Sequence, residues 1–186
     1  NMNALNSQDT ARAATVMIDG GQQLGAVLMF TLPGVPVVFA GDEFGLKGDN
    51  GEFSRTPMPW TDPSRILTDL RDTYSALTAL RRAQPALTGG GIRWLHAQGD
   101  ALAFVRETAD NTVLVVVARA AAEVDLAAGL LSARQLAALA DTPAFAVGAI
   151  TAAAGGAAAA GAAATVRAGG PAAGVWVLPG VALPAP

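Results

Sequence analysis

Two groups of polar residues in this sequence have the composition of an enzyme active site. Residues 6–10 (NSQDT) surround Asp9 with hydroxyl and amide side chains, and residues 41–43 (GDE) place Asp42 and Glu43 directly after an apolar run. Carboxylates act as acids, bases or nucleophiles, and hydrolysis of a glycosidic bond needs several around an oxocarbenium-like carbon. Asp9, Asp42 and Glu43 are therefore the first candidates for such chemistry.

The segments around these residues have the order of a strand-and-helix repeat. Apolar residues recur at helical spacing over residues 21–32, which predicts a short, largely buried helix that Pro33 ends. Residues 35–40 are mostly β-branched, aromatic or small, and we predict a buried parallel strand there. Active sites of (β/α)8 barrels lie at the carboxyl ends of the strands, so the last units of such a barrel would bring both polar groups together.

A loop and a second helix follow. Residues 47–61 are rich in Gly, Asp, Asn and Pro without periodicity, which is typical of a long functional loop. Asp62 and Pro63 have the types of an N-cap and a first helical residue, so we predict that an amphipathic helix begins there and ends before Pro85.

The pattern changes to alternation after the glycines at 89–91, which mark the expected domain boundary. An antiparallel meander is predicted there, because three alternating runs are separated by short turns. The predicted strands are residues 92–97, 101–106 and 112–118, with weaker candidates at 124–126, 145–150, 165–168 and 174–178. The Ala/Gly tract 152–164 has no large side chain to anchor it, and we expect a mobile loop.

Composition excludes several classes of function. The net charge is −3 and the 12 Lys and Arg residues form no basic run, so neither a nucleic acid nor a membrane is expected as a partner. The absence of cysteine excludes disulfides and thiolate chemistry, and fits a reducing compartment such as the cytoplasm without proving it. A single histidine also excludes a histidine-rich metal site, so we assign no metal and no cofactor to the chain, and the sequence leaves calcium dependence open.

Three blocks, in order, resemble the alpha-amylase family of glycoside hydrolases. Residues 3–12 (NALNSQDTAR) resemble the last conserved block of the family, residues 32–45 (LPGVPVVFAGDEFG) its eighth strand and ending, and residues 55–60 (RTPMPW) the following loop of alpha-glucosidases, oligo-1,6-glucosidases and neopullulanase-like members. The resemblance implies an α/β fold. Residues 1–88 would form the C-terminal part of a (β/α)8 TIM barrel, and residues 89–186 a small antiparallel β-sandwich domain.

The resemblance assigns site residues by position. Asp9 matches the third catalytic carboxylate of the family, which binds sugar hydroxyls and stabilises the transition state. Gln8 departs from the family, which usually has His there; the Gln amide donates a hydrogen bond but cannot become cationic. Substrate binding is predicted for Gln8, Arg12 and Arg55, although either arginine would also suit an ion pair with a nearby carboxylate.

For the other conspicuous residues we prefer the structural interpretation. Asp42 and Glu43 would orient loops, and Trp60 would pack its loop in preference to carrying a sugar. Trp94 and Trp176 would lie in the core, and His96 would be an ordinary strand residue.

The leading hypothesis is a glycosidase fragment. Its parent would hydrolyse, or transfer, α-glucosidic bonds of maltooligosaccharides or related α-glucans with retention, as the resemblance implies. The sequence begins with Asn1 and not with Met, so we expect an upstream region that carries the nucleophile and the acid/base, and no catalysis by these 186 residues alone. A signal peptide in that region is not excluded.

The alternative is a non-catalytic, glucan-binding or structural remnant of such an enzyme. The sequence leaves open hydrolase, transglycosylase or isomerase, α-1,4 or α-1,6 preference, and oligomeric state.

Overall fold

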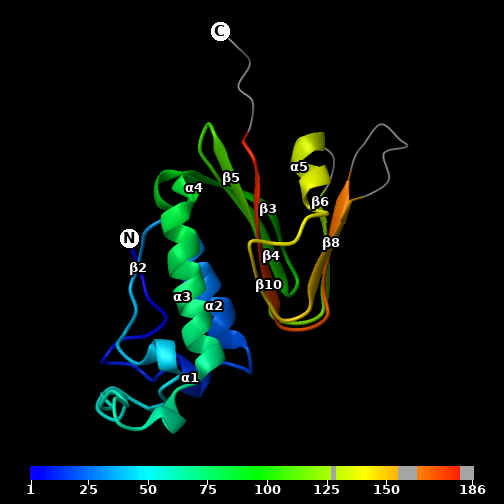
Figure 1. Ribbon diagram of the computed structural model, residues 1–186. Coiled ribbons are helices and arrows are strands. Elements are labelled where there is room, and N and C mark those ends of the chain that lie inside the picture. The colour runs from blue at the N-terminus through cyan, green and yellow to red at the C-terminus, as the bar shows by residue number, and fades with distance from the viewer. Residues whose placement is uncertain (127–128, 155–162, 181–186) are drawn as a thin grey trace.

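Two antiparallel sheets form the part of the chain after residue 90 in the computed structural model, which describes residues 1–126, 129–154 and 163–180 (Figure 1). The larger sheet has the strand order β3, β4, β5, β10, β7: β3 (Gly91–Gln98), β4 (Ala101–Glu107), β5 (Asn111–Ala118), β10 (Ala172–Pro179) and β7 (Phe145–Val147). The smaller sheet has the order β6, β9, β8: β6 (Ala122–Leu126), β9 (Ala164–Ala168) and β8 (Ile150–Ala154). The predicted antiparallel meander is confirmed as β3, β4 and β5.

The predicted strand 145–150 is divided between the two sheets. Gly148, with φ of +71°, turns the chain between β7 and β8, and a Cβ at this position would lie 2.3 Å from the carbonyl oxygen of Pro171. Only glycine adopts that conformation without strain so close to another backbone. Of the predicted mobile tract, residues 152–154 belong to β8, whereas 155–162 lie outside the described residues.

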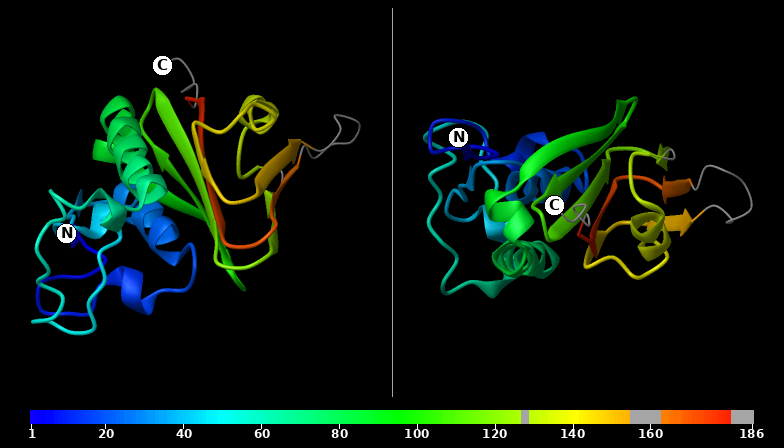
Figure 2. Two further views of the ribbon diagram at one scale, coloured as in Figure 1. Left: turned by 60° about the horizontal axis from the view of Figure 1, so that its bottom comes forward. Right: turned by 90° about the horizontal axis from the view of Figure 1, so that it is seen from above.

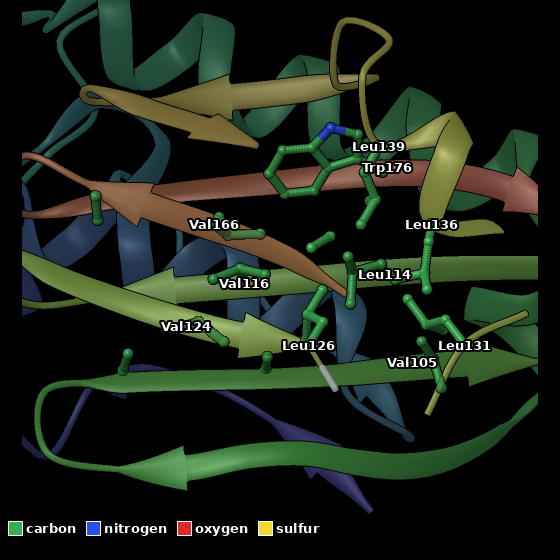
Figure 3. Packing of buried hydrophobic residues seen from close by; sticks show 14 of the residues in the cluster. Val105, Leu114, Val116, Val124, Leu126, Leu131, Leu136, Leu139, Val166 and Trp176 are labelled. Atoms are coloured by element: carbon green, nitrogen blue, oxygen red, sulfur yellow. The ribbon is translucent and has the colours of Figure 1, made fainter. Parts of the chain in front are cut away.

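The two sheets face each other across one buried apolar cluster (Figure 3). Leu114 and Val116 come from the larger sheet, and Val124 and Val166 from the smaller one. Trp176 lies in this cluster with 2% of its surface exposed, which confirms the prediction that it is a core residue.

A short helix, α5 (Ala133–Ala138), also contributes to this cluster and was not predicted from the sequence. A capping box begins it, because the Ser132 side chain accepts from the Gln135 backbone while the Gln135 side chain accepts from the Ser132 backbone. This spacing, S-x-x-Q, is a sequence signal for a helix start.

The opposite face of the larger sheet is covered by three helices, as Figure 2 shows. They are α2 (Gly21–Thr31), α3 (Thr68–Ala83) and α4 (Pro85–Gly89). Their apolar side chains, among them Val27 and Leu77, form one buried cluster with Phe104, Val115 and Val175 of the sheet. The apolar core is therefore continuous across the boundary predicted at residues 88 and 89.

The helix expected from Asp62 begins later than predicted. Asp62 and Pro63 start a separate 3-10 turn, η2 (Pro63–Arg65), in which the Asp62 carboxylate accepts from the backbone N–H of Ser64 at 3.2 Å. The longer helix α3 starts at Thr68 and ends at Ala83, before Pro85 as predicted. Asp62 and Pro63 therefore have the predicted capping roles, but the turn that they begin ends at Arg65 and does not continue into α3.

Arg106 of β4 joins the helices to the sheet. It is 1% exposed, and its guanidinium donates to the carbonyl oxygens of Thr31 at 2.6 Å, Gly90 at 2.6 Å and Gly91 at 3.0 Å. Arg81 donates in the same region to the carbonyls of Phe30 and Gly34. A positive charge near unpaired carbonyls at a helix C-terminus is stabilising, so these arginines serve as the C-terminal cap of α2.

The strand predicted at residues 35–40 is shorter and more exposed than expected. β2 (Val35–Pro36) pairs in parallel with β1 (Met2–Asn3), which confirms its direction, but Val35 is 61% exposed and the prediction of burial is wrong. In the described part of the chain, the two strands form a sheet of their own, with no third strand beside them. A parallel strand becomes buried when strands and helices surround it, and here those layers are not present.

Trp94 also differs from its prediction as a core residue. It lies on β3, at the edge of the larger sheet, and is 49% exposed while its ring contacts Phe104 edge-on at 5.1 Å. A β-bulge follows, between Trp94 and His96. An alternating pattern predicts a face of a strand but not whether another layer covers it.

In the described segments, no helix is both long and apolar enough to cross a bilayer.

Candidate active site

Asp9 lies in a tight turn between β1 and the short helix α1 (Ala13–Val16). The backbone N–H of Asp9 donates to the Ser7 hydroxyl at 3.2 Å, and Thr10 N–H donates to the Ser7 carbonyl at 3.3 Å. The N-cap of α1 is Arg12, so Asp9 does not cap a helix. Local hydrogen bonds of this kind fix a loop backbone and leave the Asp9 side chain available for other contacts.

The Asp9 carboxylate is brought together with two of the residues predicted to bind substrate. Gln8 donates its amide to one carboxylate oxygen at 2.8 Å, and Arg55, 46 positions away, donates to the other at 3.1 Å. Arg55 also donates to the Gln8 carbonyl at 3.1 Å. Both charged side chains are more than half exposed, so the pair contributes at most about 1 kcal/mol to stability. The result is an accessible carboxylate whose two oxygens each accept a hydrogen bond.

Arg12, also predicted to bind substrate, lies elsewhere. It is 1% exposed, and its guanidinium contacts the Asp42 carboxylate at 2.9 Å and the carbonyls of Ala40 and Ser54, each at 2.9 Å. Its guanidinium carbon stacks 3.9 Å from the Phe39 ring centre. Because the side chain is buried and its Nε and Nη1 groups donate to protein oxygens, Arg12 contacts the loops around it and lies apart from the exposed Asp9 carboxylate.

Asp42 begins the 3-10 turn η1 (Asp42–Phe44) and is 2% exposed. Its carboxylate accepts from Arg12 and, at 3.2 Å, from the Asn6 amide. Burial raises the pKa of Asp42, and the hydrogen bonds from Arg12 and Asn6 oppose that rise. Glu43 accepts from the backbone N–H of Gly41 at 2.8 Å. These contacts agree with the structural interpretation of both carboxylates.

The long loop at residues 47–61 packs against the Asp9 turn. Arg12 N–H donates to the Gly48 carbonyl at 2.9 Å, and a Cβ on Gly51 would lie 3.2 Å from the Asp9 Cα. Trp60 in this loop meets the Phe44 ring edge-on at 6.4 Å while 76% of it stays exposed, so its packing is only partial.

Asn6 and Ser54 have roles that were not predicted from the sequence. Asn6 lies in the block at residues 3–12, and its amide donates to the Asp42 carboxylate. Ser54 accepts from Arg12 through its backbone carbonyl, a contact that the residue type does not predict.

Asp9 stands on open surface. Three clefts of about 380, 530 and 710 Å³ in the described part of the chain are lined by other residues, the largest between α2 and the β3–β4 hairpin. Within the same described ranges, no three His, Cys, Asp or Glu side chains are placed to hold a metal ion. The geometry supplies an oriented acid group and its neighbours, and not an enclosed sugar pocket.

Comparison with known proteins identifies relatives that act on glucans. The chain is 36% identical over 120 residues to a cyclomaltodextrinase from Bacillus sp, a match that covers 62% of this chain and 21% of that protein. It is also similar to the cyclic alpha-maltosyl-(1→6)-maltose hydrolase of Arthrobacter globiformis, with 35% identity, a TM-score of 0.62, and coverage of 66% of this chain and 28% of that one.

A debranching enzyme from Nostoc punctiforme shares the fold over 94% of this chain and 34% of its own, with 23% identity and a TM-score of 0.76. No family model matches the chain. The chain spans about a fifth of the length of the curated relatives that it matches.

Proposed function

From the premise that this chain belongs to the alpha-amylase family of glycoside hydrolases, we propose that it supplies the carboxylate of Asp9 to a retaining enzyme that cleaves α-glucosidic bonds. Maltooligosaccharides or related α-glucans are the proposed substrates, because the similar proteins are named for cyclomaltodextrin and cyclic maltosyl-maltose. In the proposed reaction Asp9 binds sugar hydroxyls and stabilises the positive charge that develops at the anomeric carbon.

The observation that carries this proposal is the environment of Asp9. Gln8 and Arg55 each donate to one oxygen of the carboxylate, and the side chain remains 65% exposed. A group held in one orientation yet open to solvent suits contact with a substrate better than a structural role. Arg55 would in turn be available to a sugar hydroxyl beside Asp9.

Two domains are proposed on the same basis. Residues 1–88 would complete a (β/α)8 barrel, in which β1 and β2 are neighbouring parallel strands. Residues 89–186 would form a β-sandwich domain, which the shared cluster between the two facing sheets supports. The helices that cover the larger sheet would then form the contact between these domains.

Asp9→Asn tests the proposed role in a chimera. This chain would replace the matching 21% of the Bacillus cyclomaltodextrinase, and maltotriose hydrolysis would be measured. We expect Asp9→Asn to lower kcat/KM by a factor on the order of 10³ or more, because transition-state charge loses its partner. Asp72→Asn, an exposed carboxylate on α3, is the matched control and should leave the rate unchanged. Equal rates for Asp9→Asn and the parent chimera would refute the role.

The isolated chain is expected to release no glucose from maltotriose above a buffer blank, because neither the nucleophile nor the acid/base of the family has been assigned to a residue in it. Activity of the purified 186 residues would contradict this.

Gln8→His sharpens the assignment in the same chimera. Histidine can donate a charge-assisted hydrogen bond to the sugar, which is stronger than an amide bond by about 1–2 kcal/mol, so the rate should rise roughly 5- to 30-fold. In an active chimera, an unchanged or lower rate would show that the site has adapted to glutamine. If the chimera is inactive with either residue at position 8, the alternative of a glucan-binding remnant is favoured.

A cytoplasmic location is proposed from one relative, because the chain is 32% identical over 118 residues to the intracellular maltogenic amylase of Bacillus subtilis. Fractionation of the source cells would test it.

A further inference from the structure

We propose that Asp42 is a positioning residue, whose buried carboxylate fixes both ends of the Asp9 turn and, through Arg12, the loop that carries Arg55. This inference rests on the function proposed for Asp9. Asp42 itself is 2% exposed, and it acts on a substrate only through these other residues.

Both ends of the Asp9 turn are tied to a single oxygen atom. Asn6 and Arg12 lie on the two sides of residues 7–11, and each donates to Oδ1 of Asp42, at 3.2 Å and 2.9 Å. The side-chain oxygen Oδ1 of Asn6 also accepts from the backbone N–H of Ala13 at 3.1 Å, and this second contact fixes the Asn6 rotamer. A five-residue turn closed at both ends by one buried atom has little freedom to move Asp9.

Arg12 extends the same control to the other side of the site. Its Nε donates to the Ser54 carbonyl at 2.9 Å, and its backbone N–H donates to the Gly48 carbonyl at 2.9 Å. Ser54 is followed by Arg55, which binds the Asp9 carboxylate. Asp42, Arg12 and the long loop thus complete a closed path of contacts that begins and ends at Asp9.

Asp42 is fixed by its own surroundings. Its backbone N–H donates to the Phe39 carbonyl at 2.9 Å, and its carbonyl accepts from the Gln22 amide of α2 at 2.8 Å. The carboxylate therefore transmits the position of α2 and of the segment after β2 to the Asp9 turn. Because burial raises the pKa of Asp42, its ionised form is held against a desolvation cost, a pattern that is common at functional sites.

The kinetic test uses the chimera described above with Asp42→Asn, which keeps the shape and the acceptor oxygen but removes the charge. We expect kcat to fall about 10- to 100-fold from a small displacement of Asp9, while KM changes less than about twofold. Glu43→Gln is the matched control, because this neighbouring carboxylate contacts Gly41 N–H and should leave both constants unchanged. An unchanged kcat for Asp42→Asn would overturn the proposal.

A second test uses the isolated chain and does not depend on activity. Amide hydrogen exchange at residues 7–10 should become at least about tenfold faster in Asp42→Asn and stay unchanged in Glu43→Gln, while the amides of β4 and β5 serve as the folding reference. Unchanged exchange at residues 7–10, or equal acceleration in β4 and β5, would overturn the proposal. Should Asp9→Asn leave the chimera fully active, the proposed function fails, and this measurement still decides the role of Asp42.

Discussion

The region around Asp9 and the two facing sheets are stabilised in different ways. In the first, a buried ion pair between Arg12 and Asp42 and a set of loop hydrogen bonds hold short elements, and Val35 of β2 stays 61% exposed. In the second, apolar side chains from two sheets fill a common core around Trp176. The sheets bury their own apolar surface, whereas β1 and β2 leave much of theirs in water.

This difference separates what a segment needs for folding from what it needs for a site. Apolar packing stabilises a fold roughly in proportion to the surface that it removes from water, while a polar network depends on each donor and acceptor. The helix α2 belongs to both regions, because it covers the larger sheet and its Gln22 side chain donates to the Asp42 carbonyl. Two matched pairs of substitutions, and one substitution of a tyrosine buried between α2 and α3, test the difference between the two regions.

The largest effect is expected from removal of a tryptophan from the core. Trp176→Ala should lower the free energy of unfolding by about 3–5 kcal/mol, because it empties a large space between the sheets. Trp60→Ala, in the region of Asp9, should change it by less than about 0.5 kcal/mol, because Trp60 is 76% exposed. Urea denaturation followed by far-UV circular dichroism measures both. Similar losses for the two variants would contradict the comparison.

A smaller effect is expected where the helices join the sheet. Arg106→Met should cost about 2–4 kcal/mol, because it leaves the carbonyls of Thr31, Gly90 and Gly91 without their donor in a buried site. Arg119→Met, which removes an exposed pair with Asp100, should cost less than about 1 kcal/mol. The same denaturation experiment applies, and equal costs would show that Arg106 does not connect the two regions.

The smallest effect is expected from the Tyr74 hydroxyl, which is buried between α3 and α2 and has no hydrogen-bond partner in the described residues. Tyr74→Phe should therefore be neutral or stabilising by up to about 1 kcal/mol at pH 7.

Its pH dependence gives a second readout. Burial raises the pKa of Tyr74 from 10.0 to about 12. The unfolded chain thus loses its proton first, and the stability that is present below pH 10 decreases as the pH rises towards 12. Tyr74→Phe should lack this part of the decrease, and identical pH curves for variant and parent would refute the assignment.

Elements whose pattern is local were predictable from the sequence. The apolar spacing of α2, the alternation of β3 to β5 and the end of α3 before Pro85 were all predicted, because each depends on neighbouring residues. The three blocks at residues 3–12, 32–45 and 55–60 likewise pointed to the family through their resemblance to its motifs. The S-x-x-Q start of α5 was present in the sequence and was overlooked.

Tertiary structure decided burial and partnership. It placed Arg55 beside Asp9 from 46 positions away, took Arg12 into a buried ion pair with Asp42, and left Trp94 and Val35 exposed. A charge or an apolar face in a sequence has no fixed role until another segment packs against it, because desolvation and pairing depend on the complete surroundings of a side chain.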